Sequence, residues 1–277
     1  MLIATLLFSL MKVCVKTLSH IPAVELVFFR SVFSFFWCLT SLKLQGVPVF
    51  GKPENRLNLI LRGTTGAIAL FTFFIVIQRI PLATMTVIQY SNPIFASLLG
   101  VLILREKILA RQLLYFGISF AGIFVIYGFD FRVTTWDLFL GLFASLFAGM
   151  AYNFIRKVKT SEHPLVIVFY FPLVTLPVSA LLTYTDWVTP QGNDWYVILL
   201  LVFCVQFAQY FMTKSYQLER ISKVSIVNYS GIIYAISFGY FLFEEAVYWS
   251  TVFGIVLVLS GLVLNLFASS SKKNDVM

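Results

Sequence analysis

The chain has 277 residues, of which 60% are hydrophobic and only 12% are charged. A soluble globular domain carries about 25% charged residues, so this composition excludes one and indicates a protein that folds in a lipid bilayer. The formal net charge of +8 does not point to nucleic acid, because the lysines and arginines fall in short connections between apolar runs rather than on one face.

The three cysteines, Cys14, Cys38 and Cys204, stand singly in apolar segments. Without a CxxC pair or a Cys/His cluster, neither a disulfide framework nor a zinc site is indicated, and we expect small buried side chains. The sequence also lacks the GxxxxGK[ST] loop of ATP-binding proteins. We therefore expect no metal, no cofactor and no direct use of ATP.

Apolar runs long enough to cross a bilayer, about 17–25 residues each, recur along the whole chain. Because backbone polar groups must be satisfied inside lipid, each run is expected to form a helix. The ten expected spans are Leu2–Leu18, Pro22–Leu42, Leu57–Ile77, Leu82–Leu104, Arg111–Tyr127, Asp137–Arg156, Pro164–Tyr184, Trp195–Ser215, Ser222–Phe243 and Val247–Phe267. The connections between them are short, and no soluble domain is expected.

Lysines and arginines are distributed unevenly between the two sides of such a bundle. If the amino terminus is cytoplasmic, fifteen of them fall on the inner side, with Arg62 counted among these, four fall on the outer side, and Arg30 lies inside a span. Cytoplasmic loops are enriched in these residues. We therefore expect a multi-pass protein of the plasma (inner) membrane with both termini in the cytoplasm.

The two halves of the chain resemble each other at an offset of 139 residues, so that Ile77–Ile108 aligns with Tyr216–Val247. The identical pairs include Gln78/Gln217, Tyr90/Tyr229, Ser91/Ser230, Ala96/Ala235, Gly100/Gly239, Glu106/Glu245 and Gly122/Gly261. Such a duplication inside an apolar chain is typical of membrane transporters built from internal repeats.

Each repeat holds five spans, an odd number, so the second repeat must cross the membrane in the opposite direction. We expect a first repeat over residues 1–129, a second over 137–268 and a cytoplasmic tail over 269–277. The predicted fold class is an all-α integral membrane protein with ten transmembrane helices arranged as two inverted five-helix repeats.

Three stretches carry a family pattern: FSLMKVCVK leading into PAVELVFFR (Phe8 to Arg30), PLAT…YSNPIFASLLGVLILREK (Pro81 to Lys107) and NYSGIIYAISFGYFLFEE (Asn228 to Glu245). In order, spacing and duplication they resemble the EamA repeat of the drug/metabolite transporter superfamily, over essentially the whole chain. The resemblance implies a ten-helix inverted-repeat transporter that moves small metabolites across the plasma membrane by alternating access. It leaves the solute open, because members carry amino acids, cofactors, drugs or organic anions.

Polar side chains concentrate in the fourth and ninth spans. Polar groups in hydrocarbon must be paired or hydrated, and a cavity where the repeats meet would satisfy them. The candidates for contact with a solute are Gln89, Tyr90, Asn92, Asn228, Tyr229 and Tyr234. The alternative is that they only form hydrogen bonds between helices. Pro93 is expected to weaken the fourth helix and to release the carbonyl of Gln89.

Arg30 follows Pro22 by eight residues, which places it about 12 Å into the second span. A charge at such depth costs about 2.5 kcal/mol or more, so a functional role is the first hypothesis. Arg30 would bind a substrate carboxylate or phosphate, pair with Glu25, or bond helix carbonyls. Lys12 in the first span would join it in an electropositive cavity, whereas Lys16 would reach the outer interface.

Glu106 and Glu245 occupy equivalent positions near span ends, where proton carriers are also found. The neighbouring cations of Glu106 favour a structural role at the interface, and we expect the same for Glu245. Small residues in the fifth and tenth spans predict close helix packing, within the molecule or in a homodimer. They are Gly117, Gly122, Gly254 and Gly261.

Together these features predict a secondary transporter for a small anionic or zwitterionic solute, such as an amino acid or a carboxylate, rather than an enzyme. A non-transporting membrane scaffold would not need polar spans and a deep arginine. An integral-membrane lipid enzyme would need an acid/base or metal cluster, and no HxxH, DxxD or Ser/His/Asp arrangement is present. The direction of transport and its energy coupling stay open.

Overall fold

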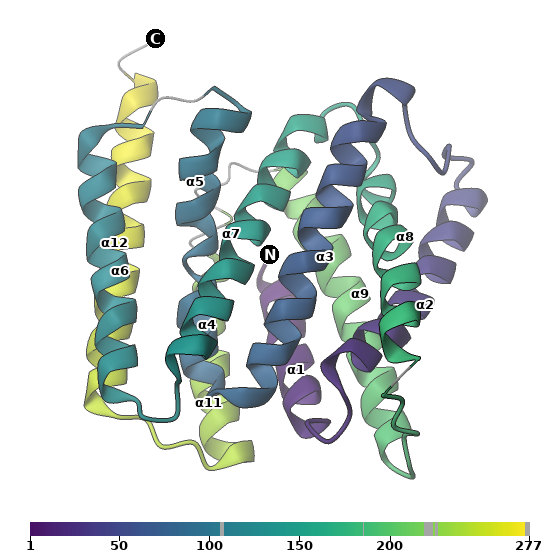
Figure 1. The fold of residues 1–277 in the computed structure, drawn as a ribbon. Coiled ribbons are helices and arrows are strands. Elements are labelled where there is room, and N and C mark those ends of the chain that lie inside the picture. Colours follow the sequence, from purple (N-terminus) through teal and green to yellow (C-terminus); the bar gives the residue numbers. More distant parts are fainter. Residues whose placement is uncertain (106–107, 185, 219–223, 225–226, 275–277) are drawn as a thin grey trace.

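A computed structural model of the chain describes residues 1–105, 108–184, 186–218, 224 and 227–274. Over these ranges the regular structure is helical, and the helices run side by side in one bundle (Figure 1). In chain order the elements are α1 (Leu2–Thr17), α2 (Ala23–Leu44), η1 (Pro53–Asn55), α3 (Arg56–Arg79), α4 (Leu82–Gln89), α5 (Asn92–Ile103), α6 (Ala110–Phe129), α7 (Thr135–Val158), α8 (Pro164–Thr183), α9 (Asp194–Leu218), α11 (Gly231–Phe243) and α12 (Trp249–Asn274).

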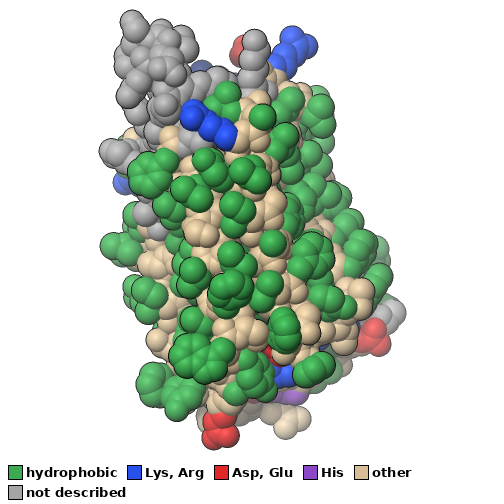
Figure 2. Space-filling model, turned by 90° about the vertical axis from the view of Figure 1, so that its left-hand side faces the viewer, with side chains coloured by type: hydrophobic (Ala, Val, Ile, Leu, Met, Phe, Trp, Pro, Cys, Tyr) green, Lys and Arg blue, Asp and Glu red, His purple; other side chains and the backbone are tan. Residues whose placement is uncertain are grey.

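Eight spans among the described residues are long and apolar enough to cross a membrane, with α4 and α5 together forming one of them, Leu82–Ile103. The helices α1, with 16 residues, and α11, with 13, are shorter than the roughly 20 residues that a crossing needs. Figure 2 shows hydrophobic side chains over most of one face of the molecule, with charged groups near its two ends. The chain is therefore a multi-pass membrane protein.

Several helices begin where the sequence supplies a start signal. The helices α2 and α4 directly follow Pro22 and Pro81, and α8 begins with Pro164. Thr134 caps α7 by accepting the Asp137 N–H at 3.1 Å, while the Asp137 carboxylate accepts the Thr134 N–H at 3.3 Å. These signals satisfy backbone donors that the first helical turn leaves without partners.

The fourth span was predicted as one helix, but it is interrupted in the structure. The helix α4 ends at Gln89, and α5 begins at Asn92 with Pro93 in its first turn. Proline has no backbone N–H, and its ring clashes with the carbonyl four residues earlier, which belongs to Gln89. The interruption therefore falls where Pro93 was expected to weaken the helix.

The helices α6 and α12 pack closely along their length because glycines face each other. A Cβ atom on Gly122 would lie 2.6 Å from the Gly254 carbonyl oxygen, and one on Gly261 would lie 2.5 Å from the Tyr115 carbonyl oxygen. A Cβ on Gly117 would meet no described atom within 4 Å, so the close packing predicted there is not formed. The other three glycines make their contact within the molecule.

Two glutamines of the two halves make similar hydrogen bonds at the ends of long helices. Gln78, near the end of α3, donates through Nε2 to the Ile21 carbonyl at 2.9 Å, in the connection between α1 and α2. Gln217, near the end of α9, donates to the carbonyls of Lys159 and Glu162 at 3.1 Å, in the connection between α7 and α8. Each amide thereby ties a helix end to a neighbouring turn.

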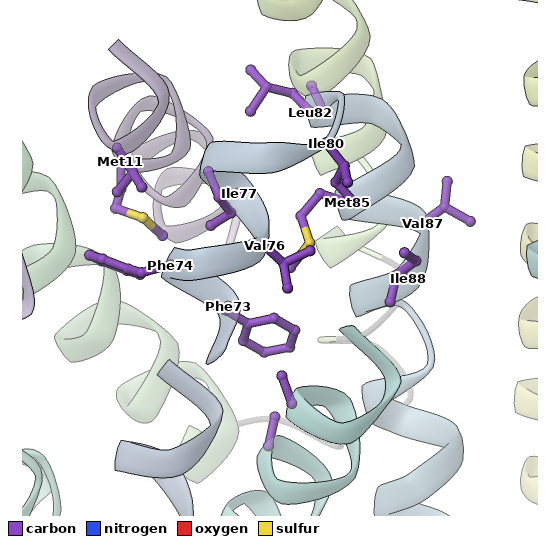
Figure 3. Close-up of a cluster of buried hydrophobic side chains, with 14 of the residues drawn as sticks. Met11, Phe73, Phe74, Val76, Ile77, Ile80, Leu82, Met85, Val87 and Ile88 are labelled. Carbon is purple, nitrogen blue, oxygen red and sulfur yellow. The ribbon is translucent and has the colours of Figure 1, made fainter. Parts of the chain in front are cut away.

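The largest apolar cluster lies where α1, α3 and α4 meet, and it contains Met11, Phe74, Ile77 and Met85 (Figure 3). Between this cluster and the helices α7 and α9 the bundle contains a cavity. The predicted pairing residue Glu106 lies outside the described residues.

Candidate functional site

A cavity of about 140 Å³ lies inside the bundle, lined by α1, α3, α4, α5, α7, α8, α9 and α11. One water needs about 10–15 Å³ of such space, so the cavity holds on the order of ten waters or a solute of similar size. Along α3 its lining extends from Arg62 to Ile77, fifteen residues apart, which is roughly 22 Å at 1.5 Å per residue. The cavity is therefore elongated along the helices.

Five of the eight residues predicted to contact a solute line this cavity. They are Lys12, Gln89, Tyr90, Asn92 and Asn228. They come from α1, from the interrupted span formed by α4 and α5, and from the segment before α11. The structure thus brings together side chains that are more than 200 residues apart in the sequence.

Tyr90 and Tyr229 meet at the interface of the two halves. The Tyr90 hydroxyl donates to the Tyr229 carbonyl at 2.8 Å, and the two rings contact edge to face with centroids 5.2 Å apart. Tyr229 lies outside the cavity lining, as does Tyr234, whose ring stacks on Phe238 at 6.4 Å. Tyr229 therefore supports the wall through its contacts with Tyr90, which is part of the wall, whereas Tyr234 contacts Phe238 outside it.

Lys12 places a cation at one end of the cavity. Its residue is 6% exposed, and its Nζ donates to the Thr86 hydroxyl at 2.8 Å. An ammonium group has three donors, so this hydrogen bond leaves capacity for a further acceptor.

Arg30 is buried as predicted from its depth, but it lies outside the cavity lining. Its guanidinium carbon stands 4.3 Å from the centroid of the Phe171 ring, a cation–π contact. The predicted alternative partner, Glu25, instead accepts the backbone N–H of Val188 at 3.0 Å. Among the described residues, Arg30 Nε and Nη1 have no hydrogen-bond partner.

Arg62 is a cavity residue that the sequence analysis placed wrongly, among the cations of an inner loop. It lies six residues after Arg56, about 9 Å into α3, is 3% exposed and lines the cavity. Its guanidinium carbon is 4.9 Å from the Phe171 ring centroid, and Nη2 donates to Gln209 at 3.4 Å. The depth criterion that singled out Arg30 would also have found it.

The described lining contains two buried cations, Lys12 and Arg62, and no aspartate or glutamate. The ring of Phe171, which lines the cavity, contacts both Arg62 and Arg30 and so connects Arg30 to the cavity. In surroundings of low dielectric constant these charges interact strongly with an anion. The site is therefore electropositive.

One turn beyond Lys12 on α1, Lys16 contacts Glu245, in the segment between α11 and α12. Its carboxylate accepts the Leu82 N–H at 2.9 Å and forms a salt bridge with Lys16. Lys16 Nζ also donates to the Ile80 carbonyl at 2.9 Å. In the structure Lys16 joins α1 to the turn between α3 and α4, and its reach to the outer interface stays a prediction.

The model of the EamA-like transporter family matches residues 1–128 and again residues 135–267. The chain belongs to this family. Both matches together cover nearly the whole sequence, and the relatives are transporters of the drug/metabolite transporter superfamily.

Three curated relatives match along most of their lengths. The pseudopaline exporter CntI of Pseudomonas aeruginosa is 29% identical over 260 residues, covering 93% of this chain and 91% of the relative. Human solute carrier family 35 member G1 is 27% identical, covering 98% and 80%, and the S-adenosylmethionine uptake transporter of Rickettsia prowazekii is 23% identical, covering 93% and 88%. These names indicate a transporter rather than an enzyme.

A solved crystal structure has the same fold, with a TM-score of 0.69 at 16% sequence identity. The match covers 98% of this chain and 97% of that chain. At this level of identity the likeness concerns the arrangement of the helices.

Proposed function

We propose that this EamA-family member is a secondary transporter that moves a small anionic or zwitterionic metabolite across the plasma membrane by alternating access. One observation carries the proposal: two buried cations, Lys12 and Arg62, line a solute-sized cavity inside a membrane bundle. Polar and charged groups are costly within a membrane and mark solute pathways. A non-transporting scaffold would not need these two buried cations.

The proposed architecture is ten transmembrane helices in two inverted five-helix repeats. The contacts between helices support this architecture, because each helix of one repeat can be replaced by its counterpart five spans away in the other repeat and the pair is still in contact. The pair α3 and α7 then corresponds to α9 and α1, and the pair α5 and α7 corresponds to α11 and α1. The pairs α2 with α8 and α6 with α12 map onto themselves. Two hydrogen bonds join positions 139 residues apart, Tyr90 to Tyr229 and Ser119 to Val258, as expected beside a two-fold axis.

The excess of lysine and arginine at one side supports an orientation with both termini in the cytoplasm. The Glu245 end of the cavity then faces outward. In this orientation the contacts of Lys16 and Glu245 close the outer entrance. Reopening this end while closing the other would complete a transport cycle.

We assign direct contact with the solute to Lys12, Gln89, Tyr90, Asn92 and Asn228, which line the cavity. In this proposal Arg30 acts through Phe171, and Tyr229 holds Tyr90 in position. The relatives are named for different solutes and for both export and uptake, so the assignment rests on the cavity rather than on any one relative.

A two-stage experiment tests the function. A thermal-shift screen of the purified protein against metabolite pools identifies a ligand, because a ligand that binds only the folded state raises its apparent stability. Uptake of that labelled ligand is then measured in proteoliposomes. We expect saturable flux in the wild type and in Lys43→Gln, which removes an exposed cation of α2, and loss of flux in Arg30→Ala and Tyr229→Ala. A ligand that binds but is never carried contradicts transport, and unchanged flux in both alanine variants contradicts the supporting roles of Arg30 and Tyr229.

A further inference from the structure

The cavity lacks a counter-charge of its own within the described residues. Lys12 and Arg62 are 6% and 3% exposed, and no aspartate or glutamate belongs to the described lining. Buried charges are stable only when they are paired. The missing negative charge is therefore expected from the ligand, and two cations leave room for two negative groups.

Arg62, which lines the cavity, has buried donors without hydrogen-bond partners among the described residues. Nε and Nη1 make no hydrogen bond to any described residue, and the bond from Nη2 to Gln209 is long, at 3.4 Å. The guanidinium lies over Gly66, where a Cβ atom would stand 2.9 Å from Nη1. Glycine at this position leaves the planar group room to face a carboxylate, for which guanidinium donors are suited.

Lys12 and Arg62 mark opposite ends of the elongated cavity. Lys12 donates to Thr86, which lies four residues after the start of α4. Because α4 begins three residues after α3 ends at Arg79, Thr86 lies near the last residues of α3. Arg62, in contrast, lies near the beginning of α3, six residues after Arg56. An elongated ligand would reach both cations.

The lining of the cavity has an apolar part, formed by α1 and α3, beside the polar residues Gln89, Tyr90 and Asn92. The apolar part includes Phe8 from α1 and Ala69, Leu70, Phe73 and Phe74 from α3. This apolar part of the lining stabilises an apolar chain of a ligand by burying it.

From this arrangement we infer that the cavity binds an elongated dicarboxylate, with one carboxylate at Arg62, the other at Lys12, and an apolar segment between them. The inference rests on the proposed function, since it names the solute class of the same cavity. It also assigns Arg62 a specificity-determining contact with the second charge. Cations and single-charge solutes of the same length are selected against.

The test measures binding to the purified full-length protein in nanodiscs, without any need for transport. The probes are straight α,ω-dicarboxylates of increasing length, the monocarboxylates and α,ω-diamines of matched length, and inorganic phosphate. We expect affinity to pass through a maximum with dicarboxylate length. At that length we expect it to exceed the monocarboxylate by about tenfold or more, as loss of one charge-assisted contact implies, with no binding of diamines.

Arg62→Gln and Lys12→Gln should each lower the affinity for the best dicarboxylate to that of the matched monocarboxylate. Lys43→Gln, which removes a cation outside the cavity, should leave it within about twofold of the wild type. Arg62→Lys keeps the positive charge and should therefore still favour the dicarboxylate over the matched monocarboxylate. An unchanged melting temperature of each variant without ligand shows that the variant folds. Equal binding of mono- and dicarboxylates, preference for phosphate or diamines, or unaltered affinity in folded Arg62→Gln overturns the inference.

The two proposals fail separately. Dicarboxylate binding without flux in proteoliposomes contradicts transport and leaves the ligand class standing. Flux of another solute, together with no binding of any dicarboxylate, contradicts the ligand class and leaves transport standing.

Discussion

Lys16 on α1 and Glu245, between α11 and α12, form a salt bridge although 229 residues separate them. Their side chains are only 18% and 10% exposed, so solvent screens the pair less than an ordinary surface pair. With the Leu82 N–H and the Ile80 carbonyl as further partners, it joins three segments at one end of the cavity.

Glu245→Gln should open this end of the cavity. We expect the substitution to destabilise the closed state by about 1–2 kcal/mol, which would raise the ratio of open to closed molecules roughly tenfold. The measurement is the labelling rate of a cysteine at Ile77, in a background without the native cysteines, by a maleimide that cannot cross the bilayer. Arg79→Gln, at a half-exposed cation of the same end, is the control. Equal labelling rates in Glu245→Gln, Arg79→Gln and the parent protein with neither substitution would show that the salt bridge does not close the cavity.

Gly122→Val should destabilise the packing of α6 on α12. The added side chain would start 2.6 Å from the Gly254 carbonyl oxygen, and overpacking of this kind costs about 1–3 kcal/mol. Gly117→Val in the same helix is the matched control, because its Cβ meets no described atom within 4 Å. Thermal unfolding in detergent compares the two. A melting temperature of Gly122→Val no lower than that of Gly117→Val contradicts the close contact.

Phe171→Leu should destabilise both buried arginines at once. The ring contacts Arg30 at 4.3 Å and Arg62 at 4.9 Å, and a desolvated cation–π contact contributes up to about 2 kcal/mol. We expect a lower melting temperature and weaker ligand binding in Phe171→Leu, and near wild-type values in Phe171→Tyr, which keeps the ring. If the leucine variant matches the tyrosine variant in both measurements, the ring does not stabilise the arginines.

Asp130, in the connection between α6 and α7, should make stability sensitive to acid. Burial alone would raise the pKa of this carboxyl, but two hydrogen bonds and the charge of Arg132 lower it below its ordinary value. A lowered pKa in the folded state stabilises the protein at neutral pH. This contribution is lost as the pH falls below about 4 and the carboxylate is protonated.

The measurement is the melting temperature of wild type and Asp130→Asn between pH 3 and 7. We expect the variant to be less stable at pH 7 and the difference to shrink towards pH 3. A difference that is constant over this range would exclude the titration of Asp130 as its cause.

Much of the fold could be predicted because lipid imposes simple requirements on the sequence. The second span, predicted over Pro22–Leu42, is observed as α2 over Ala23–Leu44, since an apolar run bounded by proline and polar residues has few alternatives. The interruption of the fourth span followed from the missing N–H of Pro93. What could not be predicted were contacts between distant segments, such as the salt bridge of Lys16 with Glu245.

The candidate site was predicted in part, for a related reason. Polar residues in apolar spans indicated Gln89, Asn92 and Asn228, which line the cavity. The orientation of Tyr229, which lies just before α11, depends on the packing of α4 and α11, which composition does not reveal. Arg62 was missed because it was counted with the loop charges, although its depth in the third span carried the same signal as that of Arg30.

Phe171 also limits which helices can separate. Because one ring contacts both Arg30 on α2 and Arg62 on α3, moving α8 away would remove the cation–π contact of two buried guanidinium groups at once. A Cβ on Gly63 would lie only 2.5 Å from the Tyr170 carbonyl oxygen, so α3 and α8 are also in direct backbone contact. We therefore expect α2, α3 and α8 to move together in any rocking of the bundle.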